Sequence, residues 1–381
     1  MKKILSTIFI LGLSILLPMT AHAGGGLPTP SAPATTDFTF SDFAVFGGNR
    51  VVLGRGIDAS DDDPDDVTPE DPNDPIIVNG GNIGSNNNIH VYGRTDTESI
   101  VGGGRFVGGH RIDVNGDVIF NENVLIYGNS HITGDVQAGG DLTLGREITV
   151  GGDVTAGGSI NLGPFDSIGG AVTANGTPTV FSPVSLPPET VFGHGTVDVR
   201  TGDYATTTLL PGSYDDLIMG DHNVLNLSAG KYYIDRLRML SSSIINIDLS
   251  GGSFELYVTN GVSLGRYMDM NLINGSAEDV YIETNNWHSY SYATLYGTIF
   301  AHNSIVVGRK THLTGALYAE NGIHVYGGSR IDFDLACHLD SDQEQCQPPP
   351  TTSAVPEPAS MALLGSGLLG AFGLRKKKAK A

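Results

Sequence analysis

Residues 112–129 read IDVNGDVIFNENVLIYGN, and residues 130–147 read SHITGDVQAGGDLTLGRE. The tripeptide Gly-Asp-Val stands at 116–118 and again at 134–136, so the repeat is 134 − 116 = 18 residues long. Within each repeat an apolar-x-apolar unit recurs every six residues, as in Val118 and Phe120. Such a unit is a short strand with one buried face, and the Gly, Asn and Asp residues between units suit turns.

Three strands and three corners in each repeat describe one coil of a triangular parallel β-solenoid. The sequence therefore predicts an all-β protein with about 18 residues per coil. Helices are expected only in an N-terminal signal segment and a C-terminal membrane tail. The frame places Leu144 inside the coil and Thr143 outside.

The six-residue frame returns between Ile299 and Ile331, and it is looser between Leu209 and Ile282. The proline-rich stretch from Phe181 to Tyr204 interrupts it and is expected to be an excursion over one face or a hinge between two blocks. A second excursion is expected from Asn285 to Tyr292.

The chain is therefore expected to fall into seven consecutive parts. These are a signal peptide (1–23), an N-terminal segment with an acidic Pro-rich loop (24–75), a first solenoid block (76–180), a Pro-rich excursion (181–205), a second solenoid block (206–335), a disulfide loop with a Pro-rich linker (336–354) and a sorting tail (355–381).

The N-terminus has the features of a secretory signal peptide. Lys2 and Lys3 precede an apolar stretch that ends at Pro18, and Ala21 and Ala23 form a small-residue cleavage site. The stretch is too short for a first transmembrane helix, so we expect export by the Sec machinery and cleavage after Ala23.

The C-terminus has three successive elements. The first is Pro356, Glu357 and Pro358; an uncharged apolar run from Ala359 to Leu374 and a basic cluster that starts at Arg375 follow. This order resembles a PEP-CTERM sorting tail, which implies recognition by an exosortase in a Gram-negative bacterium that makes exopolysaccharide. The run rises about 24 Å as a helix, so it would pause in the inner membrane with its cationic end in the cytoplasm. A permanent membrane anchor is the alternative.

The central repeats are similar to bactofilin-like and other exported bacterial β-helix domains. Pro211–Tyr214 and Ala229–Tyr232 carry a Pro-Gly-x-Tyr and Ala-Gly-x-Tyr rhythm that resembles such β-helices. The hexad repeat favours a left-handed solenoid and the bactofilin likeness a right-handed one, so handedness stays open. β-Solenoids serve as enzymes, adhesins and scaffolds, so the fold alone does not select a function.

The chain is strongly acidic, with a net charge of −20. Removal of two basic residues with the signal and five with the tail leaves 21 − 7 = 14 basic against 41 acidic residues, or about −27. Such a chain repels nucleic acid and anionic lipid surfaces, so no nucleic-acid partner is expected. Cys337 and Cys346 are the two cysteines; in an exported chain we expect a disulfide, with a metal pair as the weaker alternative. The bond would pin the segment after Ile331, which we expect to cover the open end of the solenoid.

Two groups of carboxylates are candidate cation ligands. Asp61, Asp63 and Asp65 lie in a Pro-interrupted acidic run and could bind Ca²⁺ weakly, although such runs are more often disordered. The Gly-Asp-Val aspartates stack at one corner, where turn chemistry is favoured over a cation ladder. No cofactor is otherwise expected.

No catalytic motif appears, so we expect no enzyme. Outward threonines fall on three different faces, against an ice-binding surface. Arginines follow glycines at several strand ends and could form a stripe for anionic polysaccharide or be solvated corners; they are Arg55, Arg94, Arg146, Arg266 and Arg309.

The leading hypothesis is a non-enzymatic surface or matrix protein, sorted by an exosortase and associated with exopolysaccharide or biofilm. A β-helix polysaccharide lyase or hydrolase is the first alternative, with candidate acids Asp198, Asp203, Asp215, Asp216 and Asp221. A carbohydrate-binding adhesin is the second, with Trp287, Tyr290 and Tyr292 as a stacking platform for sugars.

Overall fold

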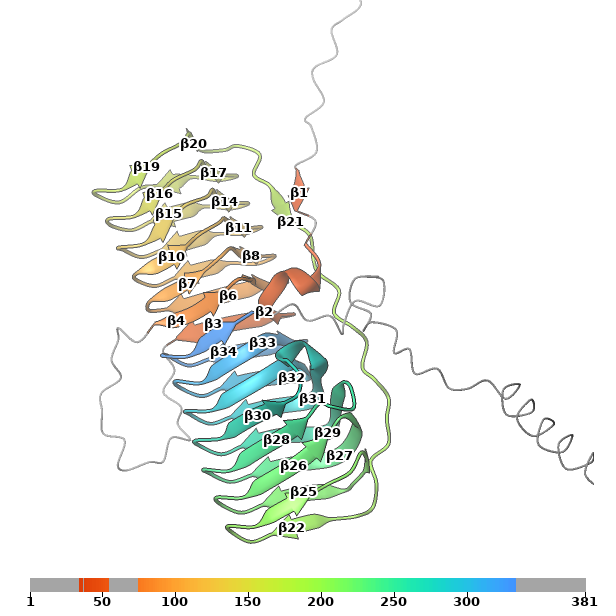
Figure 1. Cartoon of the computed structure of the whole chain (residues 1–381). Coiled ribbons are helices and arrows are strands. Elements are labelled where there is room, and N and C mark those ends of the chain that lie inside the picture. The colour runs from red at the N-terminus through yellow and green to blue at the C-terminus, as the bar shows by residue number, and fades with distance from the viewer. Residues whose placement is uncertain (1–33, 37, 55–74, 334–381) are drawn as a thin grey trace, which may run out of the picture. The chain divides into compact units, whose positions relative to one another are not determined.

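The computed structural model describes residues 34–36, 38–54 and 75–333 (Figure 1). Their only helical elements are two 3₁₀ turns, η1 (Phe40–Asp42) and η2 (Ala277–Asp279). Within these residues no helix is long and apolar enough to cross a membrane. The expected signal segment (1–23) and tail (355–381) lie outside the described residues.

The described chain is all-β and forms the predicted parallel solenoid, with 33 strands in one sheet. We number the faces of each coil in chain order, so that face 1 contains β10 (Ile112–Val114), face 2 contains β11 (Val118–Phe120) and face 3 contains β12 (Val124–Ile126). Each strand pairs in parallel with the strand of the same face in the next coil, as β11 does with β14 (Val136–Ala138).

The remaining strands fall into three groups along the chain. The first group is β1 (Thr35–Thr36), β2 (Phe43–Gly47) and β3 (Arg50–Gly54), with β21 (Val180–Phe181), which pairs with β1. The second is β4 (Ile76–Asn79), β5 (Asn82–Ser85), β6 (Asn88–Tyr92), β7 (Thr95–Thr97), β8 (Ile100–Gly102), β9 (Phe106–Gly108), β13 (His131–Ile132), β15 (Leu142–Leu144), β16 (Thr149–Val150), β17 (Val154–Ala156), β18 (Ile160–Asn161), β19 (Ser167–Ile168) and β20 (Val172–Thr173). The third is β22 (Val199–Thr201), β23 (Thr206–Thr208), β24 (Gly212–Ser213), β25 (Asp216–Met219), β26 (Val224–Ser228), β27 (Gly230–Met239), β28 (Ile244–Asp248), β29 (Phe254–Leu264), β30 (Asp269–Ile273), β31 (Val280–Ser289), β32 (Thr294–Val307), β33 (His312–Ala319), β34 (Gly322–Val325) and β35 (Arg330–Asp332).

The interior follows the alternation seen in the sequence. Leu144 is 1% exposed, whereas its neighbour Thr143 is half-buried on the outside. The inward residues of all three faces form one continuous apolar cluster along the stack. Burial of each large aliphatic side chain contributes about 1.5–3 kcal/mol, so repetition of the coil supplies the stability that a single coil lacks.

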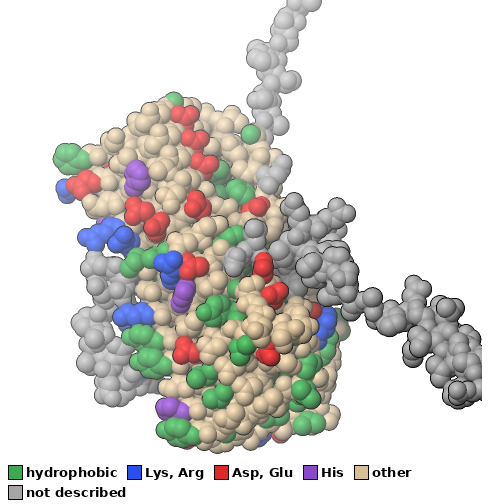
Figure 2. Space-filling model, viewed as in Figure 1, with side chains coloured by type: hydrophobic (Ala, Val, Ile, Leu, Met, Phe, Trp, Pro, Cys, Tyr) green, Lys and Arg blue, Asp and Glu red, His purple; other side chains and the backbone are tan. Residues whose placement is uncertain are grey.

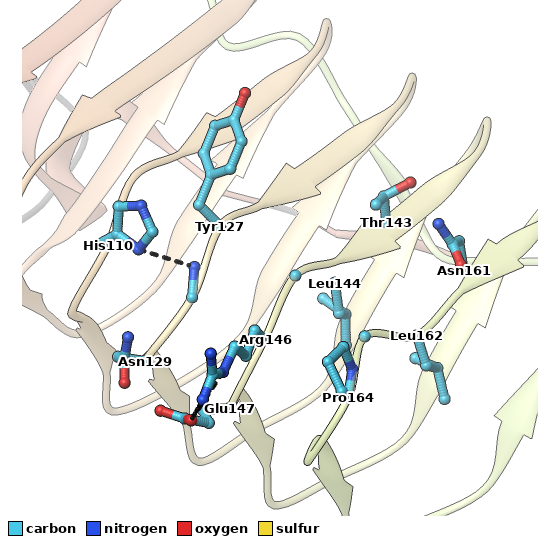
Figure 3. A pocket seen from close by; sticks show the side chains of 13 residues that line it. His110, Tyr127, Asn129, Thr143, Leu144, Arg146, Glu147, Asn161, Leu162 and Pro164 are labelled. Atoms are coloured by element: carbon cyan, nitrogen blue, oxygen red, sulfur yellow. Dashed lines mark hydrogen bonds and ion pairs between the residues drawn. The ribbon is translucent and has the colours of Figure 1, made fainter.

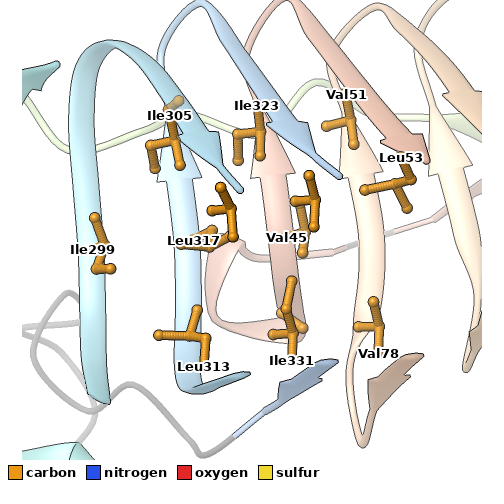
Figure 4. Close-up of a cluster of buried hydrophobic side chains, with 14 of the residues drawn as sticks. Val45, Val51, Leu53, Val78, Ile299, Ile305, Leu313, Leu317, Ile323 and Ile331 are labelled. Carbon is orange, nitrogen blue, oxygen red and sulfur yellow. The ribbon is translucent and has the colours of Figure 1, made fainter. Parts of the chain in front are cut away.

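The order of the coils in space differs from their order in the chain. β2 pairs with β5 on one side and with β33 on the other, and β3 lies in the same way between β6 and β34. Figure 4 shows the result, with Val45 and Val51 stacked beside Leu317 and Ile323. The coil at residues 43–54 therefore joins the two runs of coils into one solenoid.

This order corrects the expectation that the segment after Ile331 covers an open end of the solenoid. β35 pairs with β4, so the coil that ends at Asp332 lies inside the stack. Cys337 and Cys346 lie outside the described residues, and their disulfide stays a prediction.

Residues 182–198, which we call the strap, connect β21 to β22 and lie over the outside of face 2 (Figure 1). The Asn86 side chain bonds the backbone of Val184 twice, with its amide donating at 2.8 Å and its oxygen accepting at 2.7 Å. Asn121 holds Phe181 in the same way. The strap and its flanks cover outward apolar residues of face 2 that would otherwise face water.

Carboxylates at one corner bond from coil to coil. Asp117 accepts a hydrogen bond from the backbone N–H of Asp135, and Asp135 accepts one from Asp153, both at 2.7 Å. We expected these side chains to bond their own turns; they bond the following coil instead. Each carboxylate accepts a bond from a backbone N–H of the next coil, which offsets the repulsion between stacked charges.

The expected excursion from Asn285 to Tyr292 is wrong for most of its length. β31 runs through Ser289, and Trp287 pairs with Val262 in the coil before and Ile305 in the coil after. Trp287 points into the core and is 1% exposed. It therefore cannot serve as a stacking platform for sugars.

Candidate functional site

The corner between face 3 and face 1 has an unusual backbone. In ten of the described coils one residue of this corner has a positive φ, between 54° and 67°, although it is not glycine. These residues are Arg111, Asn129, Glu147, Phe165, Tyr204, His222, Ser242, Tyr267, Tyr292 and Lys310. Asn tolerates this conformation, but the bulky residues do so at a cost of about 1–3 kcal/mol each, which makes them candidates for a function.

Exposed aromatic side chains gather at the same corner. Among the described residues, the aromatic side chains exposed by 36% or more are Tyr92, Tyr127, Phe165, Tyr204, Tyr267 and Tyr292. Each lies on the turn from face 3 to face 1, so we call this edge of the solenoid the aromatic corner. Clustered exposed apolar surface marks binding sites more often than scattered residues do.

The rings stack along the axis of the solenoid. Tyr267 and Tyr292 lie in consecutive coils, with ring centroids 4.9 Å apart and planes 17° from parallel. The Lys310 ammonium lies 5.6 Å from the centre of the Tyr292 ring. Lower in the stack, Tyr204 and His222 are 4.7 Å apart. One-coil spacing of about 4.8 Å sets this contact, because the rings repeat with the strands.

A second row of tyrosines lies where the strands of face 3 end. Tyr92 pairs across the ladder with Gly54 in the neighbouring coil, and Tyr290 is followed one coil later by Gly308. At Gly54, φ is +91° and a Cβ atom would collide with the Tyr92 backbone, so only glycine fits. Tyrosine and glycine thus alternate in this row, and glycine leaves space between successive rings.

The aromatic corner is basic on an acidic protein. Six cationic side chains lie on it, and one of them, Arg146, pairs with Glu147 at 2.7 Å. Acidic side chains lie on the same corner in other coils, namely Asp166, Asp203 and Asp221. The six are Arg94, Arg111, Arg146, Arg266, Arg309 and Lys310. Figure 2 shows Lys and Arg side chains along the left margin, on the side of face 1. Against a net charge of −20, this stripe is a local reversal of sign.

A groove of about 860 Å³ opens on the aromatic corner (Figure 3). Tyr127, Arg146 and Leu162 line it, and His110 accepts a hydrogen bond at Nδ1 from the backbone N–H of Gly128. The groove combines an aromatic ring, a guanidinium and aliphatic carbon, which suits a ligand with apolar ring faces and negative charge.

The acids proposed for a polysaccharide-cleaving enzyme do not meet in one cleft. Asp203 and Asp221 form a backbone-bonding ladder, in which the Asp221 N–H donates to Asp203 at 2.9 Å. Asp198 is tied to Arg200 at 3.3 Å. Asp215 and Asp216 lie together, next to an acid that the sequence did not single out, Asp235.

The best-buried titratable cluster holds the strap to face 2. The Glu283 carboxylate, 2% exposed, accepts bonds from the Thr190 N–H and hydroxyl, both at 2.8 Å, and from Tyr281 at 3.0 Å. His302 bonds Glu283 and Glu320, each at 2.8 Å. Because the Glu283 oxygens are occupied by these partners, the cluster is an anchor and leaves no free base.

Several predicted site residues cannot be placed. Ala21 and Ala23, the Ca²⁺ candidates Asp61, Asp63 and Asp65, the two cysteines and the motif Pro356, Glu357 and Pro358 lie outside the described residues. Thr143, Thr149 and Thr155 lie in β15, β16 and β17, on three different faces, as the sequence predicted.

Comparison with known proteins identifies the tail of the chain. Residues 354–378 carry a PEP-CTERM protein-sorting motif. The motif marks a protein that is exported and sorted to the cell surface through the membrane, with processing by an exosortase. No curated protein matches the chain.

One solved structure is similar to this chain. It is the crystal structure of an ice binding protein from an Antarctic bacterium, Flavobacteriaceae, with 13% identity and a TM-score of 0.23. The match covers 76% of this chain and 96% of that one. A likeness of this strength carries no argument, and the fold rests on the strand pairings described above.

Proposed function

We propose that this protein is a non-enzymatic surface or matrix protein that binds anionic extracellular polysaccharide along the aromatic corner. The observation that carries the proposal is the stacked pair Tyr267 and Tyr292 beside Lys310, exposed on a basic stripe. Sugar rings present C–H groups that pack on the electron-rich faces of aromatic rings, and carboxylate or sulfate groups on the polymer would pair with arginine.

The shape of the corner supports a polymeric ligand. Because the residues of the corner repeat coil after coil, a chain laid along the axis would meet the same kind of contact many times. Each contact is weak, and their sum over a long ligand gives avidity. The PEP-CTERM motif supports the location, because sorting to the surface would expose the protein to such polymers. Retention in an exopolysaccharide matrix of a Gram-negative bacterium is part of this proposal.

Affinity electrophoresis of the exported chain tests the proposal, with polygalacturonate as the anionic probe and dextran as the neutral one. Polygalacturonate should retard the wild-type protein, and retardation should weaken as salt rises because exposed charges are screened. The double variant Tyr267→Ala, Tyr292→Ala should bind at least tenfold more weakly. Arg309→Gln should bind polygalacturonate more weakly than the wild type does. Its affinity should also fall less steeply as salt rises, because it has lost one charged contact.

Two variants serve as matched controls. Leu210→Ala removes an apolar side chain, 69% exposed, from another corner, and Arg105→Gln removes an exposed cation from another corner. Both should bind as the wild type does. Equal weakening by corner and control variants would reject the aromatic corner as the binding surface. Cleavage of polygalacturonate into shorter products would favour the polysaccharide lyase or hydrolase instead.

A further inference from the structure

A two-coil period runs along the edge of the solenoid where the strands of face 3 end. In consecutive coils from β29 to β15, the residue at this position is alternately glycine and tyrosine. The tyrosines are, in spatial order, Tyr290, Tyr326, Tyr92 and Tyr127. The glycines before, between and after them are Gly265, Gly308, Gly54, Gly109 and Gly145. We call these positions the alternating row.

The next position along the chain alternates in the opposite sense. After each tyrosine it holds a small residue, namely Ser291, Gly327, Gly93 and Gly128. After the glycines it holds arginine or histidine, namely Arg266, Arg309, His110 and Arg146, while the residue after Gly54 lies outside the described residues. At these two positions a ring and a basic side chain therefore occupy different coils, and the repeating unit of the surface is two coils, about 9.6 Å long.

The alternation continues across the junction of the two runs of coils. Gly54 lies between Tyr326 and Tyr92 in space, because β3 pairs with β34 on one side and with β6 on the other. Duplication of a pair of coils within one run would repeat the pattern inside that run, but it would not set the phase of one run relative to the other. The two-coil period therefore belongs to the assembled surface.

Histidines hold the rings of the alternating row. The ring centroids of His324 and Tyr326 lie 4.2 Å apart, and His90 Nδ1 lies 3.2 Å from the hydroxyl oxygen of Tyr92. Such contacts orient a ring before a ligand arrives, which lowers the entropic cost of binding. Tyr127 and Tyr92 are 47% and 40% exposed, whereas Tyr326 is 7% exposed, so the first two offer the larger contact surface.

The groove on the aromatic corner spans one unit of the alternating row (Figure 3). Tyr127 lies in one coil, His110 in the coil before it and Arg146 in the coil after it, and all three line the groove. The ring centroids of His110 and Tyr127 lie 5.9 Å apart. A ligand that runs along the axis would therefore meet an aromatic ring in one coil and a guanidinium in the next.

We infer that the polymer bound at the aromatic corner is an extended β-1,4-linked polyuronate, whose structure repeats every two sugars. The inference rests on the proposed function and names the substrate class. Successive sugars of such a ribbon are turned over by half a rotation, so the same ring face and the same carboxylate recur at every second sugar. The length of this two-sugar repeat is nearly that of two coils. Once per repeat, a tyrosine would pack on sugar C–H groups and a cation in the next coil would pair with a carboxylate.

Affinity electrophoresis of the exported chain tests the inference with two polymers that carry one carboxylate per sugar. Polymannuronate is β-1,4-linked and forms a flat ribbon, whereas polygalacturonate is α-1,4-linked and does not. Polymannuronate should retard the wild type at a concentration about tenfold lower than polygalacturonate does. In the double variant Tyr92→Ala, Tyr127→Ala this preference should fall to about twofold or less. Arg146→Gln, which leaves the rings in place, should also reduce it.

A second double variant separates the inference from the proposed function. Tyr267→Ala, Tyr292→Ala alters rings outside the alternating row, so it should weaken binding of both polymers by the same factor and keep the preference. Leu210→Ala, on another corner, should change neither affinity nor preference. Thermal unfolding followed by circular dichroism distinguishes loss of binding from loss of the fold.

Equal affinity of the wild type for the two polymers would overturn the inference and leave the proposed function standing. Binding of neither polymer would remove both. A preference lost equally in the two double variants, or kept in both Arg146→Gln and the Tyr92, Tyr127 variant, would show that it does not arise from the alternating row.

Discussion

The amide of Asn79 donates a hydrogen bond to the carboxylate of Asp332 at 2.6 Å, although 253 positions separate the two residues. Asp332 also accepts bonds from Arg330 at 2.8 Å and from His312 at 2.7 Å. These bonds reinforce the pairing of β35 with β4, by which the later coils join the earlier ones. The continuity of the solenoid thus depends in part on a contact between residues that are far apart in the chain.

The first prediction concerns acid stability at this junction. Burial opposes the charge on Asp332, but the bonds from Arg330, His312 and Asn79 outweigh it and hold the pKa of Asp332 at about 2. A carboxyl group whose folded pKa is depressed stabilises the fold above its unfolded pKa near 3.8 and loses that contribution as pH falls toward 2. The contribution is about 2 kcal/mol at neutral pH.

Asp332→Asn should therefore lower the unfolding free energy at pH 7 by about 1–3 kcal/mol, and by much less near pH 2. Urea denaturation at a series of pH values measures both. A variant whose deficit is the same at pH 2 and pH 7 would show that the charge of Asp332 does not stabilise the junction.

The second prediction concerns the hexad frame. Leu144→Asp places a charge among the inward residues and should cost several kcal/mol, whereas Thr143→Asp places the same charge outside and should cost less than about 1 kcal/mol. Thermal unfolding of the two variants decides the matter. Similar losses of melting temperature would contradict the alternation along β15.

The third prediction concerns the strap. Burial disfavours the charged form of His302, but bonds to Glu283 and Glu320 outweigh burial and raise its pKa. A raised pKa means that the stabilisation is complete below about pH 6.5 and is lost as pH rises through the folded pKa. The strap should therefore be cleaved faster by a protease at alkaline pH.

Glu283→Gln should increase the rate of proteolysis of the strap more than a rise in pH does. The amide would direct a donor at groups that now donate to the carboxylate, among them the Thr190 N–H, at a cost of about 2–3 kcal/mol. Glu320→Gln is the matched control, because that side chain is 43% exposed and should cost less. Limited proteolysis followed by mass spectrometry locates the cuts; cleavage in the strap at equal rates in both variants would contradict the anchor.

The sequence predicted the coil because its information is local. Alternation in Leu142 and Leu144 and the recurrence of Gly-Asp-Val follow from strand and corner geometry within one repeat. The sequence could not predict that residues 43–54 lie between two later runs of coils. A parallel ladder accepts any coil of matching shape as a neighbour, so the order of the coils in space is not encoded within one repeat. Nothing in Val45 or Val51 specifies Leu317 or Ile323 as a partner.

The candidate site was predictable in part. Arginines after glycines signalled a corner, and the structure places Arg94, Arg146, Arg266 and Arg309 on the same one. The prediction that Trp287 is exposed for sugar stacking was wrong. Trp287 pairs with Val262, 25 residues earlier, and this spacing is longer than the 18-residue repeat, so the repeat did not reveal its inward position. The stack of Tyr267 on Tyr292 was missed for the same reason.

The last prediction concerns the PEP-CTERM motif and separates processing from permanent anchoring. If an exosortase reads Pro356, Glu357 and Pro358, the mature protein loses the apolar run and its basic end and leaves the inner membrane. Glu357→Ala should block that step, because a neutral methyl group cannot make the charge-assisted bonds of a carboxylate. The precursor should then accumulate in the membrane fraction, heavier than the wild-type product by the mass of the tail.

Top-down mass spectrometry of protein extracted from the cell surface measures the outcome. An intact C-terminus through Ala381 on released wild-type protein would show that processing does not occur at this motif. Glu344→Ala, the change of a glutamate outside the matched residues 354–378, is the matched control and should be sorted as the wild type is. If both variants were retained in the membrane, the defect would lie in folding or export upstream of the PEP-CTERM motif, because only one of them alters the residues that the exosortase would read.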